Sequence, residues 1–142
     1  MKIYLASSLS QETRPDMYRA LKELRELGHE VYGPVEHIIE DAWSYSNKDW
    51  GRLVFEADIK AIKEAECIVA ISYGRTKTTA GSSWEIGYAY GTGKRVVVVE
   101  MDAGPQSLMV SNGSHATVKG IEGLIEYDFD SMPKLMTEAE QK

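Results

Sequence analysis

The stretch Thr78-Thr-Ala-Gly-Ser-Ser-Trp-Glu-Ile-Gly-Tyr-Ala-Tyr-Gly-Thr-Gly93 lies between two short apolar runs, Cys67-Ile-Val-Ala-Ile-Ser72 and Arg95-Val-Val-Val-Val-Glu100. Such runs around a small-residue segment indicate strand, loop, helix and strand, with glycine ending the helix. The second run is continuously apolar, which is typical of a parallel strand covered on both faces. The sequence therefore predicts a βαβ unit, in which a ligand binds where the strand ends and the helix begins, beside Glu85.

The rest of the chain supplies further strands and helices. Pro15 and Gly28 bracket a segment with leucines at helical spacing, which predicts an amphipathic helix from Arg14 to Leu27. The other expected elements are strands at Lys2–Ala6 and Glu30–Tyr32, a helix at Asp49–Ala65, a short helix or loop at 106–113, and one short element at 118–125. Together they predict one α/β domain over residues 1–142, with a frayed tail from about residue 132.

Composition excludes several classes of function. The net charge of −6 and the pI near 5.1 argue against a nucleic-acid partner, which favours a basic surface. The single cysteine, Cys67, offers no disulfide framework or metal cluster, and the loop after the first strand lacks the glycine pattern that binds NAD or FAD. No signal peptide or membrane-spanning run is visible. We therefore expect a cytoplasmic protein that acts on a small molecule without metal or cofactor.

Glu85 admits two interpretations. Ser82-Ser-Trp-Glu85 fits a capping box, in which the serine and the glutamate satisfy backbone amides at the start of a helix. Alternatively, Glu85 is a catalytic carboxylate. Serine hydroxyls, the close backbone approach that Gly81 allows, and nearby aromatic rings suit a sugar and a base, and these rings belong to Trp84, Tyr88 and Tyr90.

Asp58 is the second informative acid. It falls on the helical stripe formed by Phe55, Ile59 and Ile62. A carboxylate facing apolar neighbours costs several kcal/mol unless it is paired or used in chemistry. The alternative is an aspartate at the edge of the stripe that faces solvent, since such a stripe is only about 100° wide.

Two further regions carry weaker signals. Ser7 and Ser8, after the first strand, either bind substrate or form an ordinary turn. The segment from Val35 to Lys48 is irregular, which predicts a long loop or broken helix of the kind that often contacts substrate. His37, within this segment, is expected to be a plain surface residue.

Tyr4 in the first strand, Asp58 before Ile59, and Gly81-Ser-Ser-Trp-Glu-Ile-Gly-Tyr-Ala89, taken together, resemble the nucleoside 2-deoxyribosyltransferase family. The resemblance continues through Ser107-Leu-Met109 and His115-Ala116 to Tyr127-Asp-Phe129. It implies a flavodoxin-like, Rossmann-like three-layer sandwich with a mostly parallel sheet of about five strands. It also implies a homo-oligomer in which one subunit completes its neighbour's site.

The resemblance assigns a role to each of three residues. Glu85 would be the nucleophile, Tyr4 would hold and orient it, and Asp58 would manage the proton of the leaving base. Breaking a nucleoside C1′–N bond develops oxocarbenium character, which a carboxylate can trap covalently. The residues expected to bind substrate are Ser7, Ser8, Thr79, Gly81, Ser82, Ser107 and Met109.

Two departures from the transferase pattern bear on the substrate. Transferases of this family usually carry Asp six residues before the nucleophile and Asn before Leu-Met, where this chain has Thr79 and Ser107. The related branch that hydrolyses nucleoside 5′-monophosphates has serines at both positions, where they bind the 5′-phosphate. Hydroxyls donate hydrogen bonds to a phosphate dianion that an aspartate would repel. Arg75 and Lys77 either add positive charge there or remain solvated.

The leading hypothesis is therefore cleavage of a nucleoside 5′-monophosphate into free base and (deoxy)ribose 5-phosphate. One alternative is a true nucleoside 2′-deoxyribosyltransferase, which exchanges bases on 2′-deoxynucleosides. Another is a nucleotide-binding module without turnover. The presence of Tyr4, Asp58 and Glu85 argues against the binding module, because a protein that only binds has no need of a nucleophile.

Overall fold

The structure, a computed structural model, describes residues 1–74, 80–104 and 106–135. Its centre is a five-stranded sheet in the order β2-β1-β3-β4-β5, in which every neighbouring pair is parallel. The strands are β1 (Lys2–Ala6), β2 (Glu30–Tyr32), β3 (Cys67–Ser72), β4 (Arg95–Glu100) and β5 (Ala116–Lys119). The first four strands have the predicted bounds, and the expected mostly parallel sheet is wholly parallel.

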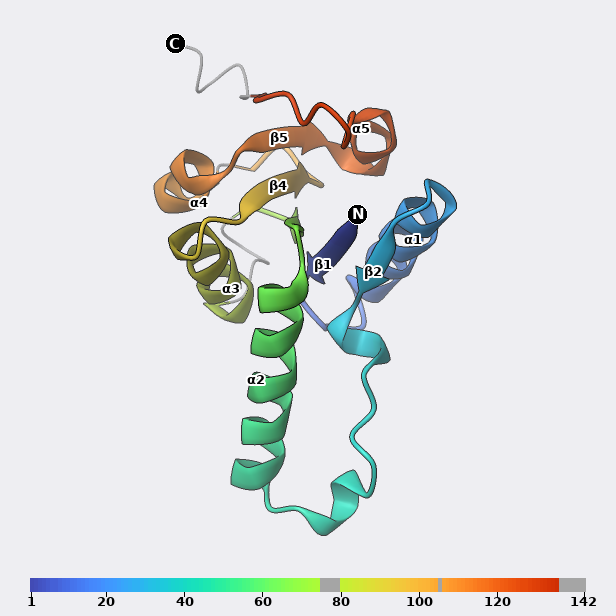
Figure 1. The fold of residues 1–142 in the computed structure, drawn as a ribbon, viewed down its shortest axis with the longest axis vertical. Coiled ribbons are helices and arrows are strands. Elements are labelled where there is room, and N and C mark those ends of the chain that lie inside the picture. Colours follow the sequence, from blue (N-terminus) through green and yellow to red (C-terminus); the bar gives the residue numbers. More distant parts are fainter. Residues whose placement is uncertain (75–79, 105, 136–142) are drawn as a thin grey trace.

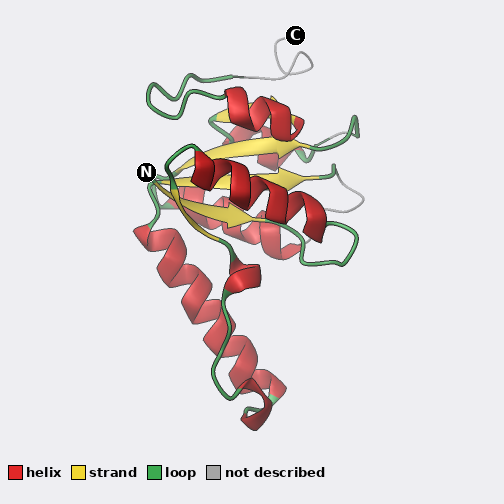
Figure 2. Cartoon of the chain, turned by 90° about the vertical axis from the view of Figure 1, so that its right-hand side faces the viewer, coloured by secondary structure: helices red, strands yellow, loops and turns green. Residues whose placement is uncertain are grey.

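Helices cover both faces of the sheet and so form three layers (Figure 1, Figure 2). The buried side chains of α1 (Arg14–Glu26) and α5 (Gly120–Glu126) pack on one face. Those of α2 (Asn47–Glu64), α3 (Ala80–Gly91) and α4 (Leu108–Gly113) pack on the other. Strand β4 contributes alternate valines to the two cores, which explains why its sequence is apolar without interruption.

The strand order locates the crevice where a ligand is expected. The chain passes from β1 outward to β2 and then crosses to β3 on the other side of β1. This order is that of flavodoxin-like folds, in which ligands bind at the carboxyl ends of the strands where the order reverses. The structure therefore confirms the flavodoxin-like expectation and directs attention to the ends of β1 and β3.

The structure differs from the sequence analysis at three places. Helix α3 begins at Ala80, ahead of Ser82. The single element expected over 118–125 is a strand and a helix, β5 and α5, joined at Gly120, whose φ of +66° suits the sharp turn. Met132, at the start of the expected tail, is buried, and the backbone of Leu135 pairs beside β5. The packed chain therefore extends to Leu135.

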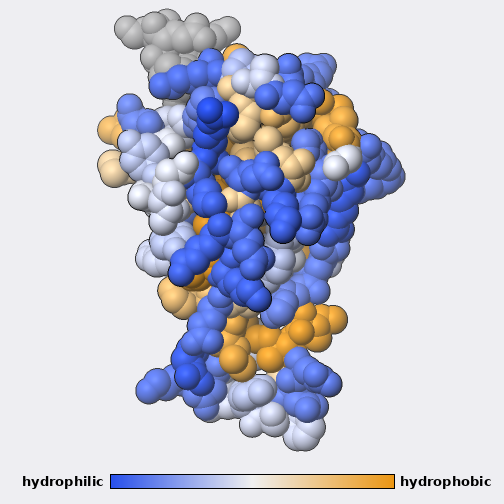
Figure 3. All heavy atoms as spheres, in the orientation of Figure 1, coloured by the Kyte–Doolittle hydropathy of each residue, from blue (hydrophilic) through white to orange (hydrophobic). Residues whose placement is uncertain are grey.

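The segment 33–46 runs outward from β2, and helix α2 runs back alongside it to the sheet, so the two project beyond the sheet (Figure 1). That segment is a long loop with two short 3₁₀ turns, Pro34–Glu36 and Ala42–Ser44, within the expected range of a long loop or broken helix. Ser46 then caps α2 by accepting a hydrogen bond from the Asp49 amide at 3.1 Å. Hydrophobic surface is visible around this projection (Figure 3). The exposed large side chains of the segment 33–46 and of α2 are Ile38, Trp43, Tyr45, Trp50 and Phe55.

Within the described residues, the helices are too short or too polar to cross a bilayer.

Candidate active site

The side chains of Tyr4 and Glu85 meet on the face of the sheet that α3 covers. Tyr4 lies in the middle of β1 and is fully buried. Its hydroxyl donates a hydrogen bond to Oε2 of Glu85. Because α3 begins at Ala80, Ser82 lies inside the helix and is not its N-cap. The capping-box interpretation of Ser82 and Glu85 is therefore wrong, and the carboxylate of Glu85 faces the site.

Asp58 and Glu85 line the same cavity. This cavity has a volume of about 490 Å³ and lies between α2 and α3. Its walls are mainly apolar or small, as the residues that line it show: Gly51, Val54, Phe55, Asp58, Ile59, Ala80, Gly81, Trp84 and Glu85. Asp58 is half-buried among the apolar residues of its own helix. It lies between the two alternatives of the sequence analysis, because it lines the cavity beside Val54, Phe55 and Ile59 and keeps part of its surface exposed.

Burial changes the protonation of both carboxyl groups. Loss of hydration raises the pKa of Glu85 to about 7, and the nearby charge of Asp58 adds to the rise, while the hydrogen bond from Tyr4 opposes it. Burial also raises the pKa of Asp58, against the effects of His37 and of the Tyr32 hydroxyl. Burial and Glu85 together raise the pKa of Tyr4, which therefore stays a donor. Paired acids in unequal environments are typical of acid–base and nucleophilic sites.

Aromatic rings border the cavity. The Trp84 ring meets Phe55 edge to face at 5.5 Å and stacks on Tyr88 at 5.5 Å with an interplanar angle of 7°. Trp84 is 50% exposed, so an open ring surface remains at the cavity. Tyr90, expected from the sequence to belong to this group, lines a different hollow.

Ser7 and Ser8, after β1, and Ser82, inside α3, do not line this cavity. Ser7 donates to the carbonyl of Ser8, and that carbonyl also accepts from the Thr13 hydroxyl at 3.0 Å, so Ser8 helps to build the turn. Ser82 is buried within α3. Residues 75–79, which include Thr79, lie outside the described residues. A role in substrate binding for these positions stays a prediction.

Ser107 and Met109 line a separate hollow on α3 and α4. It has a volume of about 260 Å³ and shares no lining residue with the cavity of Glu85. Ser107 is the N-cap residue of α4, but its side chain does not cap the helix. Met109 is 83% exposed. Within one chain, the structure therefore brings Tyr4, Asp58, Glu85 and Gly81 together and leaves this pair outside.

Two residues near the site were missed by the sequence analysis. The Tyr32 ring stacks on Tyr4, with ring centroids 5.7 Å apart and an interplanar angle of 14°. The His37 ring lies 6.1 Å from that of Tyr32 and close enough to Asp58 to lower its pKa. His37 is exposed, as expected of a surface residue. It also belongs to the cluster of Tyr32 and Asp58, which the sequence analysis did not expect. Side chains alternate between the two faces of a sheet along each strand. The pairing of β1 with β2 could therefore have indicated Tyr32, which lies opposite Tyr4 in the register.

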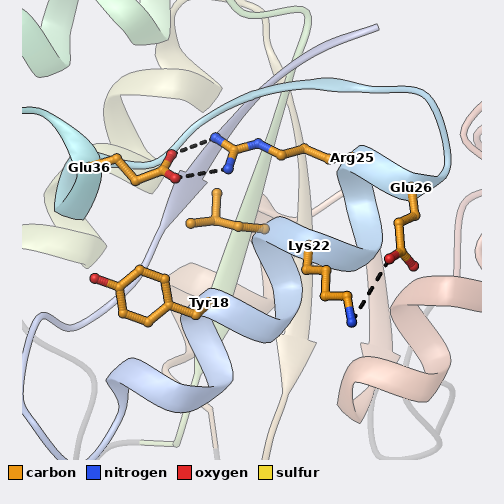
Figure 4. A pocket seen from close by; sticks show the side chains of 6 residues that line it. Tyr18, Lys22, Arg25, Glu26 and Glu36 are labelled. Carbon is orange, nitrogen blue, oxygen red and sulfur yellow. Dashed lines mark hydrogen bonds and ion pairs between the residues drawn. The ribbon is translucent and has the colours of Figure 1, made fainter.

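A further hollow of about 410 Å³ lies on the outer surface of α1 (Figure 4). Its charged side chains pair with one another: Arg25 donates to Glu36 at 2.8 Å, and Lys22 lies 3.9 Å from Glu26. Exposed pairs of this kind contribute little energy and leave no charge for a ligand. This hollow is therefore not the candidate site.

The described part of the chain contains neither a metal-binding cluster nor a reactive thiol. No group of three or more His, Cys, Asp or Glu side chains there could hold a metal ion. Cys67 is buried, and burial raises the pKa of its thiol to about 12. A thiol of this kind is inert at neutral pH.

The fold and the paired carboxyl groups fit an α/β enzyme, and comparisons with known proteins show that it is one of N-glycosidic bond chemistry on nucleosides or nucleotides. Residues 3–136 match the nucleoside 2-deoxyribosyltransferase family. The chain belongs to that family.

Two relatives and one structure of the same fold are similar to this chain. The structure of a 2-deoxyribosyltransferase from Bacillus psychrosaccharolyticus is 30% identical, with a TM-score of 0.88 over 96% of this chain and 99% of that one. A protein of Thermofilum pendens named "Putative 2′-deoxynucleoside 5′-phosphate N-hydrolase 1" is 30% identical over 104 residues, or 71% of this chain and 68% of that one. A CMP N-glycosidase from Clostridium botulinum shares the fold, at 17% identity and a TM-score of 0.61 over 89% of this chain and 96% of that one.

Proposed function

We propose that the protein cleaves the N-glycosidic bond of a nucleoside 5′-monophosphate and releases free base and (deoxy)ribose 5-phosphate. The observation that carries the proposal is the presence of two partly buried carboxyl groups, Glu85 and Asp58, in one cavity, with Tyr4 bonded to the first. This arrangement supplies a nucleophile and a proton donor to one bound sugar.

Glu85 is the nucleophile in this proposal. One of its oxygens attacks C1′ as the C1′–N bond breaks, which gives a glycosyl–enzyme bond. The hydrogen bond from Tyr4 fixes the orientation of the carboxylate. A pKa of about 7 leaves roughly half of Glu85 ionised at neutral pH.

Asp58 supports the leaving group. The base departs with the electron pair of the broken bond and takes a proton from Asp58. Burial raises the pKa of Asp58 and so favours the protonated form that this step needs. In the second step, water attacks C1′, the bond to Glu85 breaks, and the proton of the water returns to Asp58.

The choice of a monophosphate rests on Thr79 and Ser107. Both residues carry a neutral hydroxyl that can donate a hydrogen bond to a phosphate. The side chain of Ser107 makes no capping hydrogen bond in α4. Since Ser107 and Met109 line a different hollow from that of Glu85, we infer that a neighbouring copy of the chain supplies them to the site. The protein would then act as a homo-oligomer.

Base exchange on 2′-deoxynucleosides is the second candidate. The observation in its favour is the TM-score of 0.88 with a 2-deoxyribosyltransferase, over 99% of that chain. In this case a second base, not water, attacks the glycosyl–enzyme, and Asp58 takes the proton that the incoming base releases.

Product analysis separates the candidates. The protein is incubated with nucleosides and with nucleoside 5′-monophosphates, each with and without a second free base. A hydrolase releases base and sugar 5-phosphate from the monophosphate without a second base. A transferase prefers nucleosides and forms a new nucleoside only when the second base is present. Binding of either substrate without any product would contradict both candidates and favour a binding module.

A further inference from the structure

The hydroxyl of Tyr32 is buried and close to Asp58, but among the described residues it has no acceptor in hydrogen-bonding geometry. Its oxygen is also shielded from solvent. Buried hydroxyl groups in folded proteins nearly always have a partner, because an unpaired one costs stability. Tyr32 does not itself line the Glu85 cavity, but its hydroxyl lies close to Asp58, which does. An unpaired group next to a cavity residue suggests a partner that moves or a ligand that binds.

Asp58 is the acid beside this hydroxyl. Burial and the carboxyl group of Asp58 raise the pKa of Tyr32 to about 12, and the hydroxyl in turn lowers that of Asp58. The groups that face Asp58 are Tyr32 from β2, His37 from the following segment, and Tyr4 and Glu85 from β1 and α3. Tyr4 already donates to Glu85, so among the groups described around Asp58 the hydroxyl that can donate to it is that of Tyr32.

We propose that Tyr32 is a positioning residue that donates a hydrogen bond to Asp58 when substrate fills the cavity. This inference rests on the proposed function, in which Asp58 donates a proton to the leaving base. The stacked pair Tyr4 and Tyr32, which are opposite in the β1–β2 register, would then hold one carboxyl group each.

The hydrogen bond acts on the bond-breaking step. As the C1′–N bond breaks, the base takes the proton of Asp58 and leaves that carboxyl ionised. A hydroxyl donor stabilises the ionised form more than the neutral form, so it lowers the barrier to proton transfer. Tyr32 keeps its own proton throughout. The effect therefore appears in the rate of turnover and requires Asp58.

A packing role for Tyr32 makes a different prediction. The ring alone stacks on Tyr4, and phenylalanine would preserve that contact. Tyr127→Phe is a matched control, because Tyr127 packs with the core on the opposite face of the sheet and its hydroxyl donates to the Pro133 carbonyl at 2.8 Å. It removes one tyrosine hydroxyl and one hydrogen bond without touching the cavity.

The test is a double-mutant cycle measured on whichever nucleoside or nucleoside 5′-monophosphate the wild-type protein cleaves fastest. We expect Tyr32→Phe to lower kcat about ten- to hundredfold with little change in KM, as for loss of a hydrogen bond to a charged group. In the Asp58→Asn background, the same change should alter kcat by less than about twofold. Tyr127→Phe should leave both constants near their wild-type values.

Three results would overturn the inference: a kcat for Tyr32→Phe within about twofold of wild type, a rise in KM alone, or equal losses with and without Asp58. Wild-type protein that turns over neither class of substrate would instead overturn the proposed function, and the inference with it.

Discussion

The Tyr4 hydroxyl donates a hydrogen bond to Oε2 of Glu85, across 81 residues of sequence. One partner is fully buried in the inner strand β1, and the other lies in α3 at the edge of the cavity. The bond therefore ties a buried strand of the sheet to the group proposed to attack the sugar. It also opposes the effect of burial on that carboxyl group.

Tyr4→Phe removes this hydrogen bond and leaves the ring. Since the bond lowers the pKa of Glu85, its loss should raise that pKa above about 7. Fewer molecules would then carry the ionised nucleophile at neutral pH, and kcat/KM at pH 7 should fall roughly tenfold or more. The acid limb of the pH profile should move to higher pH. An unchanged limb would show that the bond does not control Glu85.

Glu85→Gln should change the dependence of stability on pH. The folded-state pKa of Glu85, about 7, lies above its ordinary value of 4.5. The folded state thus binds this proton more tightly than the unfolded state, and the resulting stability is complete below pH 4.5 and lost as the pH rises through 7. The loss amounts to about 3 kcal/mol.

Glutamine cannot ionise, so the variant escapes this loss. We expect Glu85→Gln to melt at a higher temperature than wild type at pH 8, with a smaller difference at pH 5, and to have no turnover. Glu56→Gln, on the exposed side of α2, is the control and should follow wild type. Parallel stability profiles for wild type and Glu85→Gln would contradict the raised pKa.

Asp58→Asn retains the shape of the side chain and removes its acidic proton. Turnover should fall by about 10²- to 10⁴-fold, because general acid catalysis typically contributes that much. The variant should still bind substrate, since the apolar walls of the cavity are intact. Wild-type kcat in this variant would remove Asp58 from the mechanism.

Thr79→Asp distinguishes the two candidate functions. If Thr79 and Ser107 bind a 5′-phosphate, a carboxylate at position 79 should weaken cleavage of the monophosphate at least ten- to hundredfold and affect an unphosphorylated nucleoside far less. Ser107→Ala should act in the same direction, but more weakly. Improved base exchange by Thr79→Asp, together with a wild-type preference for nucleosides, would support the transferase instead.

Mixed oligomers test where Ser107 acts. If Ser107 serves the site of a neighbouring subunit, a mixture of Ser107→Ala and Glu85→Gln chains contains some sites with both native residues. Such mixtures should regain activity that neither variant has alone. Activity equal to the sum of the separate variants would place Ser107 in the site of its own chain.

Periodicity predicted most of the fold. The first four strands alternate with helical segments, of which α1 is bounded by Pro15 and Gly28, and these local signals agree with the packed structure. The split between β5 and α5 was missed because both are short and the turn between them depends on the backbone of Gly120. The burial of Met132 was missed because it results from packing against residues distant in sequence.

The site was predictable in part. The resemblance placed Tyr4, Asp58 and Glu85 in one site, and the structure brings them to one cluster. Tyr32 escaped notice and His37 was expected to be a plain surface residue, because their positions depend on the pairing of β1 with β2 and on the path of the segment that follows. The position of Ser82 inside α3 excludes the capping box, and the catalytic role of Glu85 stays a prediction. The limits of a helix are the least certain feature of a sequence pattern.

Covalent trapping tests the central claim, that Glu85 attacks the sugar. A nucleoside 5′-monophosphate with fluorine at the 2′ position slows breakdown of the glycosyl–enzyme, because fluorine destabilises the oxocarbenium-like transition state. After acid quench and trypsin digestion, the peptide from Thr78 to Lys94 has Glu85 as its one acidic side chain. We predict that mass spectrometry finds the added sugar phosphate on this peptide, at Glu85, in wild type and in Asp58→Asn. An unmodified peptide during demonstrated turnover, or an adduct at another residue, would contradict the account.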